Sequence, residues 1–116
     1  MISQKPYLIK AIYEWCVDNK FTPYIASAVD EKTKVPLQYV DNNQIILDIS
    51  KTSTRDLIID TYWITFYAIF GGMEHSLSLP ISNIIAIFAK ENGQGMQFNI
   101  EANANKNESN GLRLVK

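Results

Sequence analysis

The chain contains 116 residues, a length typical of one domain and too short for two. Hydrophobic residues account for 47% of it, enough for a core that needs no disulfide or bound metal for support. Eleven Lys and Arg residues against twelve Asp and Glu residues give a net charge of −1, which argues against binding to duplex DNA or to an anionic membrane surface.

The chain has one cysteine and one histidine, which limits the disulfides and metal sites that it could form. Cys16 cannot form a disulfide within the chain, and a lone cysteine fits the reducing cytoplasm. His75 alone cannot supply the clustered ligands of most transition-metal sites, so we expect no metal and no other cofactor. No apolar run approaches the ~20 residues of a membrane span, and the first residues lack the pattern of a signal peptide. These features predict a cytoplasmic protein without membrane contact.

Residues 6–19 predict a helix, because Pro6 suits a first helical turn and no Gly or further Pro interrupts the segment. Lys10, Glu14 and Asp18 recur every fourth residue and form one polar stripe, while both flanks of that stripe are apolar. Such a wide apolar surface exceeds what packing against one sheet requires. Either the domain encloses the helix, or one flank covers a partner subunit. We favour the second, because a helix at the start of a small chain is seldom enclosed.

After Pro23 the pattern changes to short β-strands separated by turn residues at regular spacing. The predicted strands are residues 24–29, 35–40, 44–50, 61–70, 76–79 and 84–90, with a last short one at 96–98. One helix followed by six or seven strands predicts a mainly β fold, a small and strongly bent antiparallel barrel or sandwich with one N-terminal helix.

The two most apolar strands carry more apolar surface than one barrel interior can use. In residues 61–70 one face holds Phe66, Ala68 and Phe70, and the opposite face is also largely apolar. Residues 84–90 repeat this pattern. Because an antiparallel strand with one wet face should alternate apolar with polar residues, we expect the second face to be covered by the helix, by another subunit or by an extended ligand.

Composition changes abruptly after Phe98. Residues 99–111 contain five asparagines and one large apolar residue, which predicts a flexible linker after a domain at residues 1–98. Residues 112–116 return to three apolar side chains and two cations. They form either a last strand of the barrel or a short binding motif carried on the linker.

Residue patterns of known catalytic sites are missing. Cys16 lies among apolar helix neighbours, where a small core filler is the simpler interpretation, and His75 follows a predicted hairpin turn. The turn pair Gly71 and Gly72 has neither the Lys-Ser/Thr of a phosphate-binding loop nor the context of a dinucleotide site. Asp48 has no carboxylate partner in the pattern. We therefore expect no enzymatic activity.

Single-stranded RNA is an alternative ligand, since small bent barrels often stack bases on aromatic side chains. Trp63, Tyr67 and Phe88 would provide such a platform, but Lys51 and Arg55 are the nearest cations in the sequence. Without a basic track the phosphate contribution to nucleic-acid binding is small.

Several stretches of the chain, taken in order, resemble one known family. The first two are P-Y-L-I-K-A-I-Y-E-W at residues 6–15 and D-N-K-F-T-P-Y at 18–24. The others are V-P-L-Q-Y (35–39), Q-I-I-L-D-I (44–49), F-Y-A-I-F-G-G (66–72), L-P (79–80), A-I-F-A-K-E-N-G-Q-G-M-Q-F (86–98) and L-R-L-V-K (112–116). In this order they resemble the SspB family, bacterial adaptors that deliver ssrA-tagged proteins to the ClpXP protease.

The resemblance implies an Sm-like or SH3-like bent barrel, a homodimer formed through the N-terminal helix, and a tag-binding groove on the barrel surface. The implied dimer interface consists of Leu8, Ala11, Ile12 and Trp15. The implied tail motif, which would dock on the N-terminal zinc-binding domain of ClpX, consists of Leu112, Arg113, Leu114, Val115 and Lys116.

Our candidates for the tag-binding groove are Phe66, Ala68 and Phe70, with Asp48, Ser50 and Phe88 as neighbours. Ala68 is small enough to let a peptide backbone approach. The chain departs from the family in two respects. Its linker is short and nearly neutral instead of long and acidic, and Ile69 stands where members usually carry Arg, which puts in doubt any polar contact there to acidic residues of the tag.

Three functions therefore remain open at this point: a tethering adaptor, an Sm-like protein that binds single-stranded RNA, and a dimeric scaffold without a ligand. The surplus apolar surface and the resemblance both favour the adaptor.

Overall fold

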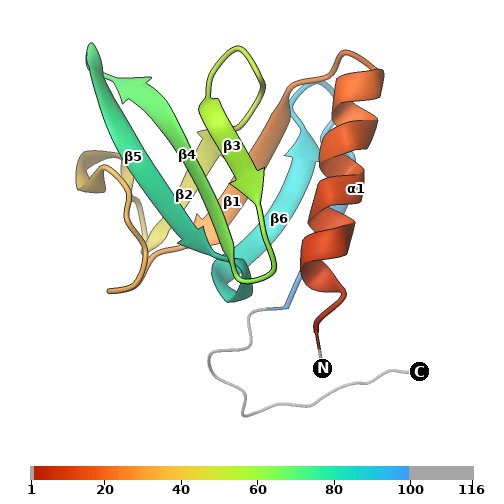
Figure 1. Ribbon diagram of the computed structural model, residues 1–116, viewed down its shortest axis with the longest axis horizontal. Coiled ribbons are helices and arrows are strands. Elements are labelled where there is room, and N and C mark those ends of the chain that lie inside the picture. Colours follow the sequence, from red (N-terminus) through yellow and green to blue (C-terminus); the bar gives the residue numbers. More distant parts are fainter. Residues whose placement is uncertain (1, 100–116) are drawn as a thin grey trace.

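The computed structural model of the protein describes residues 2–99 (Figure 1). Its regular elements are α1 (Lys5–Asp18), β1 (Pro23–Ala28), β2 (Gln44–Asp48), β3 (Arg55–Ile59), β4 (Trp63–Phe70), β5 (Met73–Pro80), β6 (Ile84–Ala89) and β7 (Gly95–Gln97). Two short 3₁₀ helices, η1 (Leu37–Tyr39) and η2 (Ile81–Asn83), lie in the connections. Apart from Asn99, the predicted linker at 99–111 and the tail motif at 112–116 lie outside the described residues.

The strands form two antiparallel sheets, which we call sheet A and sheet B. Sheet A has the strand order β2-β1-β6-β7, and sheet B has the order β3-β4-β5. One core cluster draws side chains from both sheets, although within residues 2–99 no strand pairing joins the sheets into a closed barrel. The fold is therefore mainly β with one N-terminal helix and small bent antiparallel sheets, which confirms the predicted fold class.

Two segments differ from the predicted strands. The segment at 35–40 forms η1 instead of a strand, because Pro36 has no N–H to donate to a sheet and leads directly into the 3₁₀ turn. On either side of it, Lys34 keeps a β-bridge to Ser78 of β5 and Asp41 keeps one to Gln44 of β2. Conversely, β3 forms at residues that the sequence pattern left between two strands. Its pairing with β4 contains a register shift, which disturbs the alternation that would have revealed it.

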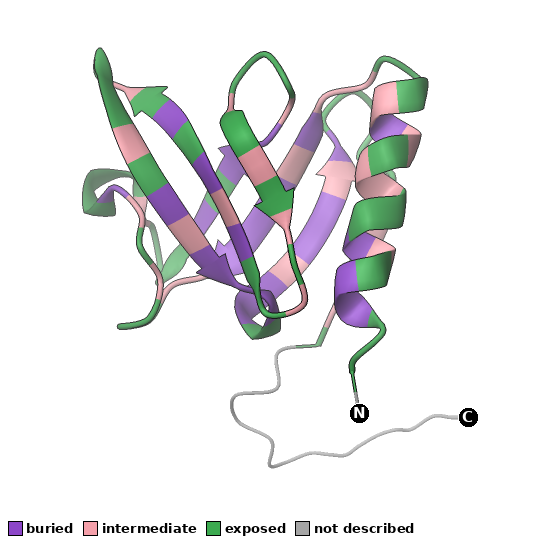
Figure 2. Ribbon diagram, in the orientation of Figure 1, coloured by how far each residue is buried: buried purple, intermediate pink, exposed green. Residues whose placement is uncertain are grey.

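The core lies between the inner faces of the two sheets. On β4, Ile64, Phe66 and Ala68 point inward and are at most 8% exposed, and Figure 2 shows the alternation of buried and exposed residues along this strand. Leu79 and Leu77 of β5 stand opposite Ile64 and Phe66 and are fully buried. Burial of such a side chain stabilises the fold by about 1.5–3 kcal/mol.

Helix α1 covers one side of the sheets and packs against β6, β1 and β3 (Figure 1). Ile9 and Cys16 are fully buried on the side of the helix that faces the sheets. On the helix, Leu8 and Trp15 are half-buried and Ala11 is exposed, so the single chain does not enclose the helix on every side. Among residues 2–99, no helix has the length and apolarity that crossing a membrane requires.

Gly71 and Gly72 form the two-residue turn between β4 and β5. Both have positive φ, 58° and 82°, a combination that suits a tight hairpin and that glycine adopts without strain. The turn fixes the register that places Ile69 of β4 directly opposite Glu74 of β5. These two side chains therefore share the outer face of sheet B near the hairpin tip.

Adjacent isoleucines on β2 test this arrangement. Ile45 is 2% exposed and belongs to the core, whereas Ile46 is 60% exposed on the opposite face. We predict that Ile45→Ala lowers the free energy of unfolding by about 2–5 kcal/mol, whereas Ile46→Ala lowers it by less than about 1 kcal/mol. Urea unfolding of both variants measures the difference. Equal losses would contradict the assignment of the two faces.

Candidate functional site

A hollow of about 370 Å³ lies at one end of sheet B, where the connection from β2 to β3 approaches β4 and β5. We call it the Ala68 hollow. Its lining residues are Thr52, Ser53, Thr54, Arg55, Tyr67, Ala68, Ile69 and Glu74. Hydroxyl groups of the β2–β3 connection form one wall, and side chains of β4 form the other, so the hollow offers both polar and apolar contacts.

The β2–β3 connection is held in place by its own hydrogen bonds. The Ser50 N–H donates to Asp48 Oδ1 at 2.9 Å, and the Thr54 hydroxyl donates to the Ser50 carbonyl oxygen at 2.9 Å. The Ser50 hydroxyl donates to Ser53 Oγ at 3.1 Å. Local bonds of this kind fix a turn without help from other elements. They therefore give the hydroxyl wall of the hollow a defined position.

Ala68 lies where the core meets this hollow. Its side chain points to the inner face of β4 and is 8% exposed, and it still contributes to the lining. The next residue, Ile69, points to the outer face and is 69% exposed. We expect a longer side chain at position 68 to reach from the edge of the core into the hollow.

Arg55 connects the three strands of sheet B across the outer face. Its Nε and Nη2 donate to the two carboxylate oxygens of Glu74 on β5, each at 3.0 Å, and its Nη1 donates to Asp56 Oδ2 at 2.9 Å. The guanidinium lies 4.3 Å from the ring centroid of Tyr67 on β4. Hydrogen bonds from Arg55 lower the pKa of the Glu74 carboxyl below its usual value.

A second hollow of about 480 Å³ adjoins the first along β4. Its lining residues are Asp56, Leu57, Ile58, Thr65, Phe66, Tyr67, Ser76 and Ser78. Tyr67 lines both hollows, so they follow one another along the same strand. We call the two together the β4 track. Such a track fits an extended chain better than a compact small molecule.

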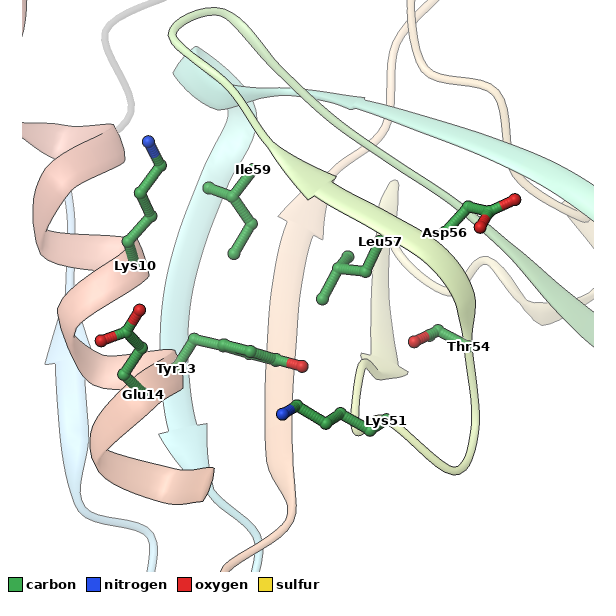
Figure 3. A pocket seen from close by; sticks show the side chains of 8 residues that line it. All are labelled: Lys10, Tyr13, Glu14, Lys51, Thr54, Asp56, Leu57 and Ile59. Atoms are coloured by element: carbon green, nitrogen blue, oxygen red, sulfur yellow. The ribbon is translucent and has the colours of Figure 1, made fainter. Parts of the chain in front are cut away.

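A third hollow of about 400 Å³ lies between α1 and β3 (Figure 3). Its lining residues are Lys10, Tyr13, Glu14, Lys51, Thr54, Asp56, Leu57 and Ile59. In Figure 3 the Tyr13 hydroxyl points toward the Lys51 side of this space, and burial raises the pKa of Tyr13. Two cations and two carboxylates line it, so its charges balance and favour no single class of ion.

Comparison with known proteins shows the family. A family model described as stringent starvation protein B, SspB, matches residues 3–113. The chain belongs to the SspB family. A protein described as "Stringent starvation protein B homolog" from Haemophilus influenzae (strain ATCC 51907 / DSM 11121 / KW20 / Rd) is 40% identical over 99 residues. The match covers 84% of this chain and 66% of that relative, so the chain spans just under two thirds of the relative's length.

The structure brings some of the groove candidates of this SspB-family protein together. Ala68 lines its hollow, and Ser50 and Asp48 hold the β2–β3 connection that forms the opposite wall. Phe66 lies almost entirely in the core at 2% exposure, and it lines the second hollow. Phe70 is half-buried, and its ring lies beside the rings of Tyr39 and His75, at centroid distances of 5.2 and 5.7 Å.

Phe88 lies apart from the other groove candidates. It is on β6 of sheet A, opposite Tyr24 of β1, and the two ring centroids are 6.0 Å apart. Its side chain shares the outer face of sheet A with Tyr24, whereas Ala68 points to the inner face of sheet B. The structure therefore does not bring Phe88 to the Ala68 hollow.

The residues predicted for the dimer interface fall into two groups. Ile12 packs against the core of its own chain, whereas Leu8, Ala11 and Trp15 retain partly or fully exposed surface. The Trp15 ring also packs edge-on against Phe21, at a centroid distance of 5.4 Å. Their role in a dimer stays a prediction. The five tail residues at 112–116 lie outside the described part of the chain.

The sequence patterns did not reveal that Arg55 and Glu74 pair at the edge of the Ala68 hollow, which we call its charged rim. Arg55 and Glu74 lie nineteen positions apart in sequence, and no local pattern links them. They meet because β3 and β5 flank β4, so only the strand order reveals the pair. Among residues 2–99, no group of three His, Cys, Asp or Glu side chains is placed to hold a metal ion.

The Glu74 carboxyl provides a pH test of the rim. A carboxyl whose pKa is lowered in the folded state adds stability above its unfolded pKa, and this contribution disappears as the pH falls through the folded-state pKa. We predict that Arg55→Met returns the pKa of Glu74 toward its usual value and weakens the dependence of stability on pH in the acid range. Side-chain NMR titration of Glu74 in both proteins measures the shift. An unchanged Glu74 pKa in the variant would contradict the role of Arg55.

Proposed function

We propose that this protein is an adaptor that binds ssrA-tagged substrates as extended peptides and tethers them to the ClpX unfoldase for degradation by ClpXP. Membership of the SspB family supports this proposal. The observation that carries it is the β4 track, because two adjoining hollows along one strand suit an extended, unfolded segment.

The dimensions of the track fit a peptide. β4 contains eight residues and spans on the order of 25 Å in extended conformation. The track combines hydroxyl side chains, such as Thr65 and Ser76, with the apolar surfaces of Ile58 and Tyr67. Hydroxyl groups bond the polar main chain of a ligand, and apolar surfaces receive its side chains. In this arrangement Ala68 allows the peptide backbone to approach the end of β4.

Tethering is the second half of the proposal. Residues 112–116 would dock on ClpX while the groove holds the tag, and the linker at 99–111 would join the two functions. Thirteen residues extend at most ~45 Å, so delivery would require close approach of adaptor and unfoldase. A homodimer through α1 would carry two tails, and tethering would hold the tag at roughly millimolar effective concentration near the pore. The ATP-driven work belongs to ClpX.

One observation favours the alternative of single-stranded RNA. Trp63 and Tyr67 are 41% and 37% exposed on the same face of β4, which would allow bases to stack. Arg55 is the cation beside Tyr67, however, and two carboxylates already pair with it. This leaves little positive charge for a phosphate backbone, so the peptide remains the favoured ligand.

Ala68 and Ala86 offer a matched pair of substitutions for the binding site. Both alanines are 8% exposed on central strands, but only Ala68 lines the β4 track. We predict that Ala68→Gln weakens binding of a labelled ssrA-tag peptide at least about tenfold, because the longer side chain occupies the hollow, whereas Ala86→Gln leaves the affinity within about twofold. Fluorescence anisotropy measures both affinities, and circular dichroism checks that both variants fold. Unchanged affinity in a folded Ala68→Gln protein would remove this residue from the groove.

Deletion of residues 112–116 tests the tether separately from the groove. We predict that the truncated protein binds the tag peptide with unchanged affinity but no longer accelerates degradation of a tagged reporter by ClpXP. Anisotropy and a gel-based degradation assay provide the two readings. If both activities disappeared together, the division into groove and tail would be wrong. Salt-sensitive binding of a short RNA oligonucleotide, with no binding of tag peptide, would support the alternative ligand instead.

A further inference from the structure

We infer that the charged rim of the Ala68 hollow selects peptides by charge: it accepts an uncharged hydrogen-bond acceptor, such as an amide, and disfavours a carboxylate at the same position. This inference rests on the proposed function, because it assumes that the hollow receives a peptide. It concerns the cluster of Arg55, Glu74, Asp56 and Tyr67, which neither the sequence patterns nor the family resemblance assigned to the groove.

The cation of this rim is already neutralised. Both Glu74 oxygens accept from Arg55 at 3.0 Å, and Asp56 Oδ2 accepts at 2.9 Å, so two carboxylates surround one guanidinium. Because Arg55 is always protonated, the cluster carries one net negative charge at neutral pH. A third carboxylate brought by a peptide would meet repulsion from the two already present.

The guanidinium nevertheless keeps hydrogen-bonding capacity. It has more N–H groups than the three that the carboxylates use, and among the described residues one N–H on each Nη nitrogen has no further acceptor. The bidentate contact with Glu74 and the ring of Tyr67 hold the guanidinium plane in one orientation. A neutral oxygen, from a main-chain carbonyl or an Asn or Gln side chain, could accept from it without adding charge.

The linings of the two hollows of the β4 track together carry one net negative charge. Arg55 and Glu74 are the charged members of the Ala68 hollow, and Asp56 is the charged member of the second hollow. Lys51 lines neither of these two hollows, although it shares the space between α1 and β3 with Asp56. Ile69 stands directly opposite Glu74 and is 69% exposed, so an apolar side chain occupies the place where a second cation could have paired with Glu74. The preferred ligand is therefore an extended peptide that is uncharged where it passes Ile69 and Glu74.

The test compares isosteric peptides on the full-length protein. The probes are a labelled ssrA-tag peptide and a series in which each acidic residue is replaced in turn by its amide, measured by anisotropy at low and high salt. At one position the amide should bind about 3- to 10-fold more tightly than the acid, and high salt should reduce the difference. Glu74→Gln should reduce this preference to less than about twofold, because one of the repelling charges is gone.

Glu31→Gln is the matched control, since Glu31 is an exposed carboxylate in the connection between β1 and η1 and lines none of these hollows. This variant should keep the preference for the amide. Equal binding of acid and amide peptides at every position, or a preference that Glu74→Gln leaves intact, would overturn the charge selection while leaving the proposed function standing. If no peptide of the series bound the wild-type protein, the proposed function would fail, and the charge selection with it.

Discussion

β4 carries apolar side chains on both faces, yet a chain of this size has only one core to receive them. Ile64, Phe66 and Ala68 fill that core from one face, and removal of such side chains from water is the main stabilising contribution to the fold. The opposite face, with Tyr67 and Ile69, then remains at the surface. The exposed face of β4, together with Ala68 at the edge of the core, lines the proposed binding track.

Much of the architecture could be predicted from local patterns. The helix expected at 6–19 is found at Lys5–Asp18, and the glycine pair that ends β4 forms the expected hairpin. The errors occur where local pattern and tertiary pairing disagree. Pro36 converts an apolar run into a 3₁₀ turn, whereas β3 exists because β4 offers it a partner. A strand that forms because a neighbouring strand pairs with it shows little alternation of apolar and polar residues in its own sequence, so periodicity does not predict it.

Only part of the candidate site could be predicted from the sequence, again because local patterns do not contain the pairing of distant strands. Ala68 could be named from the family resemblance because it is small enough for a peptide backbone to approach, and Ser50 could be named as its neighbour. The partnership of Arg55 and Glu74 could not, since it needs the order β3-β4-β5 and the bulge next to Asp56, whose φ is 57°. Residues that lie together on one face of a sheet come from separate strands. Whether they meet is therefore decided by the strand order, which a local sequence pattern does not contain.

The charges of this protein influence association mainly through short-range contacts and little through a long-range field. With a net charge of −1, long-range steering contributes little to association, so recognition must depend on short-range contacts. Hydrophobic contacts along β4 are non-directional, so by themselves they would accept many different unfolded segments. In the proposed complex, discrimination would come from polar groups on this face such as Arg55, which contacts two carboxylates and an aromatic ring. A guanidinium whose charge is balanced by carboxylates, but which still has N–H groups free to donate, would favour an amide over a carboxylate. A cation without such partners would favour the carboxylate.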